Sequence, residues 1–185
     1  MNTSKLKSLV LTLFISILFF QTIDGAAQLD PYQLKAAFIY KFLLFTDFPK
    51  TETDHHNRHL SICIYGQDPF KDAFNPVIGK IVKNRILKVK NIDKSTPIDR
   101  VQKCQVIFFS KQNNVTDIDH TINAVKNSSI LTIGERENFI YRGGMIRLYT
   151  NLGKTEFSVN MDNAEISKIK FRSQMLRIAN IVIDN

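Results

Sequence analysis

The sequence has no tryptophan and only two cysteines and seven glycines among its 185 residues. The few glycines form no phosphate-binding loop, because Gly143-Gly144 leads into Met-Ile-Arg, which predicts a strand rather than the start of a helix. The chain also has no G-x-S-x-G nucleophile elbow and no H-E-x-x-H zinc motif. These absences argue against an enzyme, and we expect neither catalytic residues nor a cofactor.

Long hydrophobic runs are missing as well. The longest reaches from Leu9 to Phe20 and is interrupted only by Thr12 and Ser16, whereas a helix needs ~20 apolar residues to cross a bilayer. Two lysines precede this run and small residues follow it up to Ala27, which is the order of a signal peptide. We therefore expect residues 1–27 to be a signal peptide cleaved near Ala27, and residues 28–185 to form a single exported domain. An uncleaved anchor is the alternative, and a lipoprotein anchor has no cysteine for attachment.

Acidic residues are outnumbered by basic ones, 17 to 25, so the formal net charge is +8. A basic chain often binds nucleic acid, but export makes this partner unexpected here. Acidic proteins, anionic lipid headgroups and the cell envelope remain as partners. The alternative is that the charge only keeps the protein soluble.

The two cysteines are Cys63 and Cys104. In an oxidising compartment two cysteines indicate one disulfide, and both lie at strands that we expect to be neighbours in a sheet. Two buried free thiols are the alternative.

Hydrophobic patterning predicts alternating helices and strands. A helix that is apolar on nearly all sides is expected from Pro31 to Pro49 and must be buried or covered by a partner. Apolar runs within 59–65, 101–110 and 129–133 predict strands buried on both faces. Further expected elements are helices at 115–127, 162–169 and 171–183, the last with an apolar face of Met175, Leu176, Ile178, Ala179 and Val182, and hairpins around Lys83-Asn84 and Asn151-Leu152-Gly153.

This order of elements predicts the fold class α/β: a layered sandwich with a mixed, mainly parallel central sheet flanked by helices.

The sequence contains a candidate zinc site and a candidate apolar ligand pocket, and each also has an ordinary structural explanation. Asp54, His55, His56 and His59 could bind zinc, but consecutive ligands strain a tetrahedral site, and a solvated loop is the favoured reading. The 14 phenylalanines could line an apolar ligand pocket, although core packing is the default account.

Five segments in order resemble the YfiR family of small periplasmic proteins. The first is a helix of the type Y-x-x-K-A-A-F-x-Y-x-F-x-x-F, and the others resemble C-x-x-G-x-D-P-F, C-x-x-x-F-x-S, I-L-T with a later F-x-x-x-G-G-M-I, and F-x-[IV]-N followed by a helix. In this sequence they stand as Tyr32, Lys35, Ala36, Ala37, Phe38, Tyr40, Phe42, Phe45 and Pro49; Cys63, Gly66, Asp68, Pro69 and Phe70; Cys104, Phe108 and Ser110; Ile130, Leu131, Thr132, Phe139, Gly143, Gly144, Met145 and Ile146; and Phe157, Val159, Asn160, Ala164, Ser173, Leu176 and Ala179. Phe48 and Lys41 depart from the pattern, as do Lys168, where the family tends to have Gly, and Arg172, where it tends to have Ser.

The resemblance implies a regulator in the periplasm rather than an enzyme. Its partner would be the periplasmic sensor portion of an inner-membrane diguanylate cyclase, which it represses, and an OmpA-like outer-membrane lipoprotein would relieve the repression. A homodimer is also considered. The alternative is a periplasmic small-molecule binding domain accessory to an envelope receptor or transporter.

We expect the partner-binding residues in the segment after the second hairpin. Apolar residues there could be interface anchors, with core packing as the alternative, and basic residues would speed encounter with an acidic partner. The predicted set is Phe157, Val159, Asn160, Lys168, Ile169, Lys170, Phe171 and Arg172.

Overall fold

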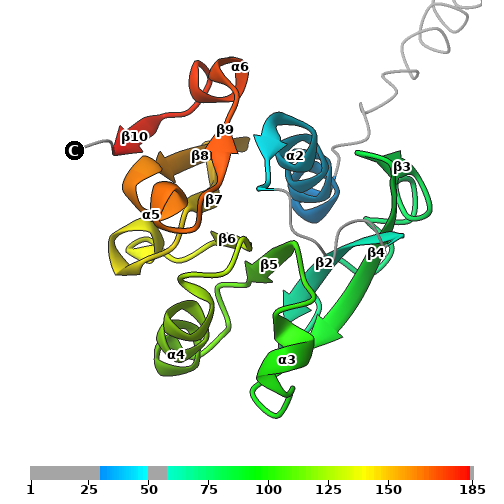
Figure 1. Ribbon diagram of the computed structural model, residues 1–185. Helices are drawn as coiled ribbons and strands as arrows, with labels where there is room; N and C mark the ends of the chain where they lie inside the picture. The colour runs from blue at the N-terminus through cyan, green and yellow to red at the C-terminus, as the bar shows by residue number, and fades with distance from the viewer. Residues whose placement is uncertain (1–29, 50–57, 184–185) are drawn as a thin grey trace, which may run out of the picture.

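The computed structural model describes residues 30–49 and 58–183 (Figure 1). In chain order the elements are α2 (Pro31–Phe45), β1 (Thr46–Asp47), β2 (His59–Tyr65), β3 (Ile81–Val82), β4 (Arg85–Ile92), α3 (Ile98–Val101), β5 (Val106–Phe109), α4 (Val115–Val125), β6 (Leu131–Gly134), the 3-10 helix η2 (Phe139–Arg142), β7 (Ile146–Asn151), β8 (Lys154–Asn160), α5 (Met161–Ile166), β9 (Lys170–Phe171), α6 (Ser173–Leu176) and β10 (Ile181–Ile183). The signal peptide predicted for residues 1–27 lies outside the described residues. None of the helices in the described ranges is long and apolar enough to span a membrane.

Eight strands form one mixed sheet in the order β10-β8-β7-β6-β5-β2-β4-β3. The strands β4, β2, β5, β6 and β7 are parallel neighbours, and β10 is parallel to β8. Antiparallel pairing in this sheet is confined, among the described strands, to the hairpins β3–β4 and β7–β8. The predicted α/β fold with a mixed, mainly parallel sheet is therefore confirmed.

The central strands bury side chains on both faces of the sheet, as their apolar runs predicted. In β2, Ile62 and Ile64 point into a core cluster that includes Ile39 and Phe42 of α2. Cys63 alternates with them and belongs to a second cluster on the opposite face, together with Ile118, Ile122 and Val125 of α4. The sheet therefore lies between a layer that contains α2 and a layer that contains α4 (Figure 1).

Helix α2 begins as the sequence predicted and ends earlier. The Asp30 side chain accepts a hydrogen bond from the Tyr32 amide, and Pro31 occupies the first helical position. The helix ends at Phe45 rather than at Pro49, because Thr46 and Asp47 extend and pair antiparallel with Phe171 and Lys170. The small β1–β9 sheet therefore joins the end of α2 to the C-terminal segment.

The helix predicted for residues 171–183 is wrong. Phe171 belongs to strand β9, only Ser173–Leu176 is helical, and Ile181–Ile183 is a strand parallel to β8. The Asn180 amide donates to the Phe157 carbonyl at 2.8 Å, and the β-branched run Ile-Val-Ile suits the free edge of β8 better than a helix. Of the predicted apolar face, Met175 is buried, whereas Ile178 and Val182 are exposed.

Candidate functional site

The loops after β5 and β6 meet at the carboxyl edge of the sheet, where ligand sites of parallel α/β folds lie. Phe109 and Gly134 are paired in register, so both strands end at the same level. Ser110, Lys111 and Asn113 follow β5, and Glu135 and Arg136 follow β6. This edge therefore gathers polar and charged side chains from two loops.

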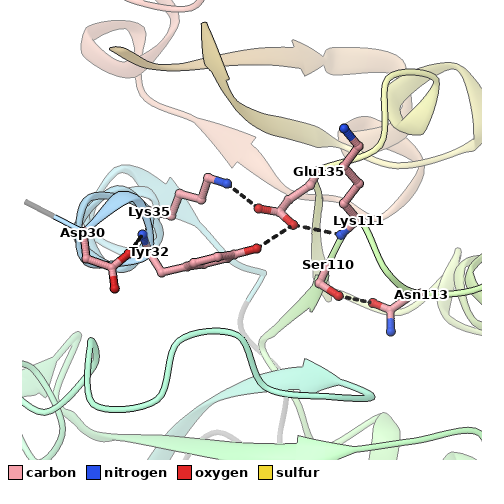
Figure 2. A network of polar contacts seen from close by, with 7 residues as sticks. All are labelled: Asp30, Tyr32, Lys35, Ser110, Lys111, Asn113 and Glu135. Carbon is pink, nitrogen blue, oxygen red and sulfur yellow. Dashed lines mark hydrogen bonds and ion pairs between the residues drawn. The ribbon is translucent and has the colours of Figure 1, made fainter. Parts of the chain in front are cut away.

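Glu135 is the centre of a buried polar network between this edge and α2 (Figure 2). It forms an ion pair with Lys35 and accepts hydrogen bonds from the Tyr32 hydroxyl at 3.4 Å and from the Lys111 amide at 2.8 Å. Lys35 and Glu135 are only 8% and 7% exposed. Because each buried charge has its counter-charge, the network anchors α2 to the sheet at the level where β5 and β6 end.

The pKa of Tyr32 is strongly shifted by its surroundings. Burial, followed by the charge of Glu135 and the hydrogen bond to it, raises the pKa of Tyr32 to about 12. The Lys35 ammonium also lies 4.6 Å from the centre of the Tyr32 ring. A phenol held protonated in this way is a hydrogen-bond donor to Glu135 and not a base.

A second set of contacts ties the loop after β2 to the same edge. The Asn113 side-chain amide donates to the Tyr65 carbonyl at 3.1 Å, and Arg136 donates twice to the Asn113 carbonyl, at 3.1 and 2.7 Å. Gly66 has a φ of +73°, and a Cβ there would lie 2.6 Å from the Asn113 amide nitrogen. The turn after β2 therefore requires glycine both for its backbone and for space.

A pocket of about 350 Å³ opens beside these loops, at the start of α4. Its wall is apolar at Val115, Ile118 and Phe139. Its rim is charged, with a salt bridge between Arg142 and Asp119, and it includes Lys111, Arg136, Glu137 and Asn138. An apolar wall beside charged side chains is a lining that suits a small amphiphilic molecule.

The structure places the apolar part of the predicted partner-binding set inside the protein. Phe157 and Val159 are buried in the cluster that contains α2, and the Phe157 and Phe42 rings lie 4.8 Å apart in a T-shaped arrangement. Ile169 and Phe171 are buried in the same cluster. Asn160 is buried as the N-cap of α5 and donates to the Ile140 carbonyl. Core packing, the alternative considered for these residues, accounts for their positions.

The basic part of the set lies at the surface. Lys168, Lys170 and Arg172 are exposed. Arg172 and Lys83 both reach Asp47, at 3.2 and 3.0 Å, so the tip of the β3–β4 hairpin lies next to β9. The hydrogen bonds from Arg172 and then Lys83 lower the pKa of Asp47. The folded protein thus presents a mostly cationic surface where β1, β9 and the β3–β4 turn meet.

Lys168 occupies the C-terminal cap of α5. Its φ is +57°, its amide donates to the Glu165 carbonyl, and the Ile169 amide donates to the Ala164 carbonyl. This is the Schellman pattern that ends a helix, in which glycine is the usual residue at the left-handed position. The departure from glycine at Lys168 is therefore a departure at the C-terminal cap of α5.

The predicted disulfide is present. Cys63 and Cys104 are bonded, with their Cα atoms 5.9 Å apart, and both are buried in the cluster that contains α4. The bond joins the central strand β2 to the loop two residues before β5. Its burial among apolar side chains suits a structural role rather than a redox-active one.

Metal binding has no support in the described ranges. There, no group of three or more His, Cys, Asp or Glu side chains is arranged to hold a metal ion. Asp54, His55 and His56 of the sequence candidate lie outside the described residues, and His59 begins β2.

Sequence reasoning missed the Lys35–Glu135 network and the charged rim of the pocket. Two signals were available. A lysine in a helix that is otherwise almost wholly apolar must find a partner, and side chains directly after buried parallel strands meet at one edge of the sheet. Lys111, Glu135 and Arg136 all satisfy the second signal.

Comparisons with known proteins place this fold. The family model described as YfiR/HmsC-like matches residues 32–180. A solved structure, a conserved domain protein from Vibrio cholerae O1 biovar eltor, superposes with a TM-score of 0.59 at 14% sequence identity, and this likeness shows the fold alone. The match covers 84% of this chain and 61% of that chain. A comparison with curated proteins finds no match.

Proposed function

The chain belongs to the YfiR/HmsC-like family, and we propose that it represses an inner-membrane diguanylate cyclase by direct binding, thereby controlling cyclic di-GMP signalling and biofilm formation. The observation that carries the proposal is the family match over residues 32–180, since this family consists of periplasmic regulators of such cyclases. The described residues add a mostly cationic surface around Asp47, to which Lys83 and Arg172 both bind.

Export is part of the proposal. The short apolar run and the small residues up to Ala27 support a signal peptide that is cleaved after this residue. The mass of the protein recovered from the periplasm should correspond to a chain that begins at Gln28. A membrane-bound product that retains Met1 would contradict this part of the proposal.

The exposed basic residues Lys168, Lys170 and Arg172 are the proposed contacts with the cyclase. They lie beside Lys83 at the end of α2, so an acidic sensor surface would be attracted over several charges at once. The buried apolar members of the predicted set would support this surface from below. An OmpA-like lipoprotein that competes for the same surface would relieve the repression.

The proposal is tested by genetics and by a matched pair of charge reversals. Deletion of the gene should raise cellular cyclic di-GMP and promote attached growth. Restoring the gene should reverse both effects, whereas Lys168→Glu/Lys170→Glu/Arg172→Glu should fail to do so. The control Lys94→Glu/Arg100→Glu/Lys103→Glu makes the same charge change around α3 and should restore repression. Unchanged cyclic di-GMP on deletion, with no cyclase retained by the tagged protein, would reject the repressor function.

A second function is favoured by the pocket at the start of α4. Its volume of about 350 Å³ and its mixed apolar and charged lining fit a small amphiphilic molecule. The protein would then be a small-molecule binding domain accessory to an envelope receptor or transporter. Benzoate, used as a probe, should shift the amide resonances of residues 111–119 and 136–142 under this alternative and leave them unchanged under the first. Sedimentation of the same sample would report whether the protein forms a homodimer.

A further inference from the structure

The segment from Ala73 to Ile92 contains five cations and no carboxylate. The cations are Lys80, Lys83, Arg85, Lys88 and Lys90. The segment includes the β3–β4 hairpin, which forms the edge of the sheet opposite to β10. The excess of positive charge in the protein is thus concentrated at one edge of the fold (Figure 1).

The same segment exposes apolar side chains. Ile78, Ile81 and Ile86 are 48%, 74% and 40% exposed. Ile81 and Ile86 lie directly opposite each other in the antiparallel pair. The other face of the hairpin packs against the core, where Val82 and Leu87 are buried. The exposed isoleucines therefore do not contribute to the packing of the core.

The exposed lysines flank the isoleucines on one face. Side chains alternate along a strand, so Lys88 and Lys90 project from β4 on the same side as Ile86. Lys83 stands at the turn, where it and Asn84 both have positive φ, and it contacts Asp47. The face therefore combines two exposed isoleucines, Ile81 and Ile86, with two lysines next to them, Lys88 and Lys90.

From this combination we propose that the β3–β4 hairpin docks on a bilayer with anionic headgroups. The isoleucines enter the boundary between headgroups and acyl chains, and Lys88 and Lys90 lie among the phosphates. Protection of a sheet edge against strand addition would account for the lysines but not for an isoleucine that is three-quarters exposed beside them. An anionic bilayer suits both kinds of side chain, because its phosphates lie directly above its acyl chains.

The inference does not depend on the proposed repression. Docking would hold the protein at a membrane surface with the hairpin tip toward the lipid. Because Lys83 and Arg172 share Asp47, the exposed residues of β9 would then lie close to that membrane.

The test is co-sedimentation of the full protein, purified from the soluble envelope fraction, with two kinds of vesicle. Vesicles of phosphatidylcholine mixed with phosphatidylglycerol should retain the protein at low salt and release it at high salt, and vesicles of phosphatidylcholine alone should not retain it. Lys88→Gln/Lys90→Gln should weaken binding roughly 25-fold, which corresponds to about fivefold for each cation. Ile81→Ser/Ile86→Ser should weaken it roughly tenfold or more.

Matched controls lie elsewhere on the surface. Ile178→Ser/Ile181→Ser removes two exposed isoleucines at the opposite edge, and Lys103→Gln/Lys126→Gln removes two exposed lysines. Both should bind as the parent protein does, and circular dichroism should show that all variants fold. The inference is overturned by absence of binding to the anionic vesicles, by equal losses in hairpin and control variants, or by binding to an acidic protein with none to lipid.

Discussion

Lys35 and Glu135 are separated by 100 residues in the sequence and form a buried ion pair in the fold. The pair joins the first described helix to the carboxyl edge of the sheet, and Tyr32 and the Lys111 amide complete the shell of the carboxylate. The Glu135 carboxylate thus accepts hydrogen bonds from three donors. Because both charges are buried, each member of the ion pair needs the other as its counter-charge.

Removal of one partner should therefore be costly. Lys35→Met should lower the free energy of unfolding by about 3 kcal/mol, because it leaves Glu135 buried without its counter-charge. Lys41→Met, at an exposed lysine of the same helix, should change it by less than about 0.5 kcal/mol. Urea denaturation measures both. In a double-mutant cycle, Lys35→Met/Glu135→Gln should lose less than the sum of the single changes, and strict additivity would show that the two residues act independently.

The disulfide should contribute more than any single surface contact. Cys63 and Cys104 close a loop with a sequence separation of 41, for which the chain-entropy model gives about 4 kcal/mol. Cys63→Ala/Cys104→Ala should thus lower the free energy of unfolding by about 2–4 kcal/mol. Reducing agent should destabilise the parent by a similar amount and leave the double variant unaffected. A parent protein that is indifferent to reductant would contradict this role.

Lys168→Gly should stabilise the protein. The lysine holds a φ of +57° at the end of α5, where glycine avoids the strain of the left-handed region. The greater freedom of glycine in the unfolded chain offsets part of the gain, so the net increase should be about 0.5–1 kcal/mol in urea denaturation. Gly143→Ala provides the converse, because Gly143 has a φ of +94° and should lose stability on gaining a side chain.

Asp47 should titrate below the usual range for an aspartate. The side-chain hydrogen bond from Arg172 is the largest cause and that from Lys83 the next, so Arg172→Gln should raise the pKa of Asp47 more than Lys83→Gln does. Carboxyl carbon chemical shifts measured against pH report this directly. The reverse order of the two variants would show that Lys83 is the main partner.

The lowered pKa of Asp47 determines in which direction folding stability changes with pH. Because the folded pKa of Asp47 lies below its unfolded value, the stabilisation is present above the unfolded pKa and is lost as the pH falls through the folded one. Asp47→Asn should be slightly less stable than the parent at neutral pH, by well under 1 kcal/mol for so exposed a pair. The difference should disappear in acid.

The sheet was predictable because its signals are local. The apolar runs that became β2, β5 and β6 are short and bounded by polar residues, and the turns Lys83-Asn84 and Leu152-Gly153 have the positive φ values that tight hairpins require. The C-terminal segment was not predictable, because Met175, Ile178 and Val182 fit a helical stripe equally well. Only the neighbouring edge of β8 makes a strand of Ile181–Ile183.

The site was less accessible from sequence because it is made by long-range contacts. No local pattern pairs Lys35 with Glu135 or brings Lys83 and Arg172 to the same carboxylate, that of Asp47. The apolar residues Phe157 and Ile169 look the same in sequence whether they anchor a partner or fill a core. In the fold both are buried in the core cluster that contains α2.

The pairing of β1 with β9 has a consequence for biosynthesis. Asp47 meets Arg172 at a sequence separation of 125, and the core cluster that contains α2 also includes the late residues Phe157, Ile169 and Met175. At about 5–20 residues per second, a ribosome needs roughly 6–25 s to make that stretch. Throughout this interval the nascent helix has an apolar surface without its native cover. The core around α2 is therefore completed only after the C-terminal residues have been made, so α2 keeps part of its apolar surface uncovered until late in synthesis.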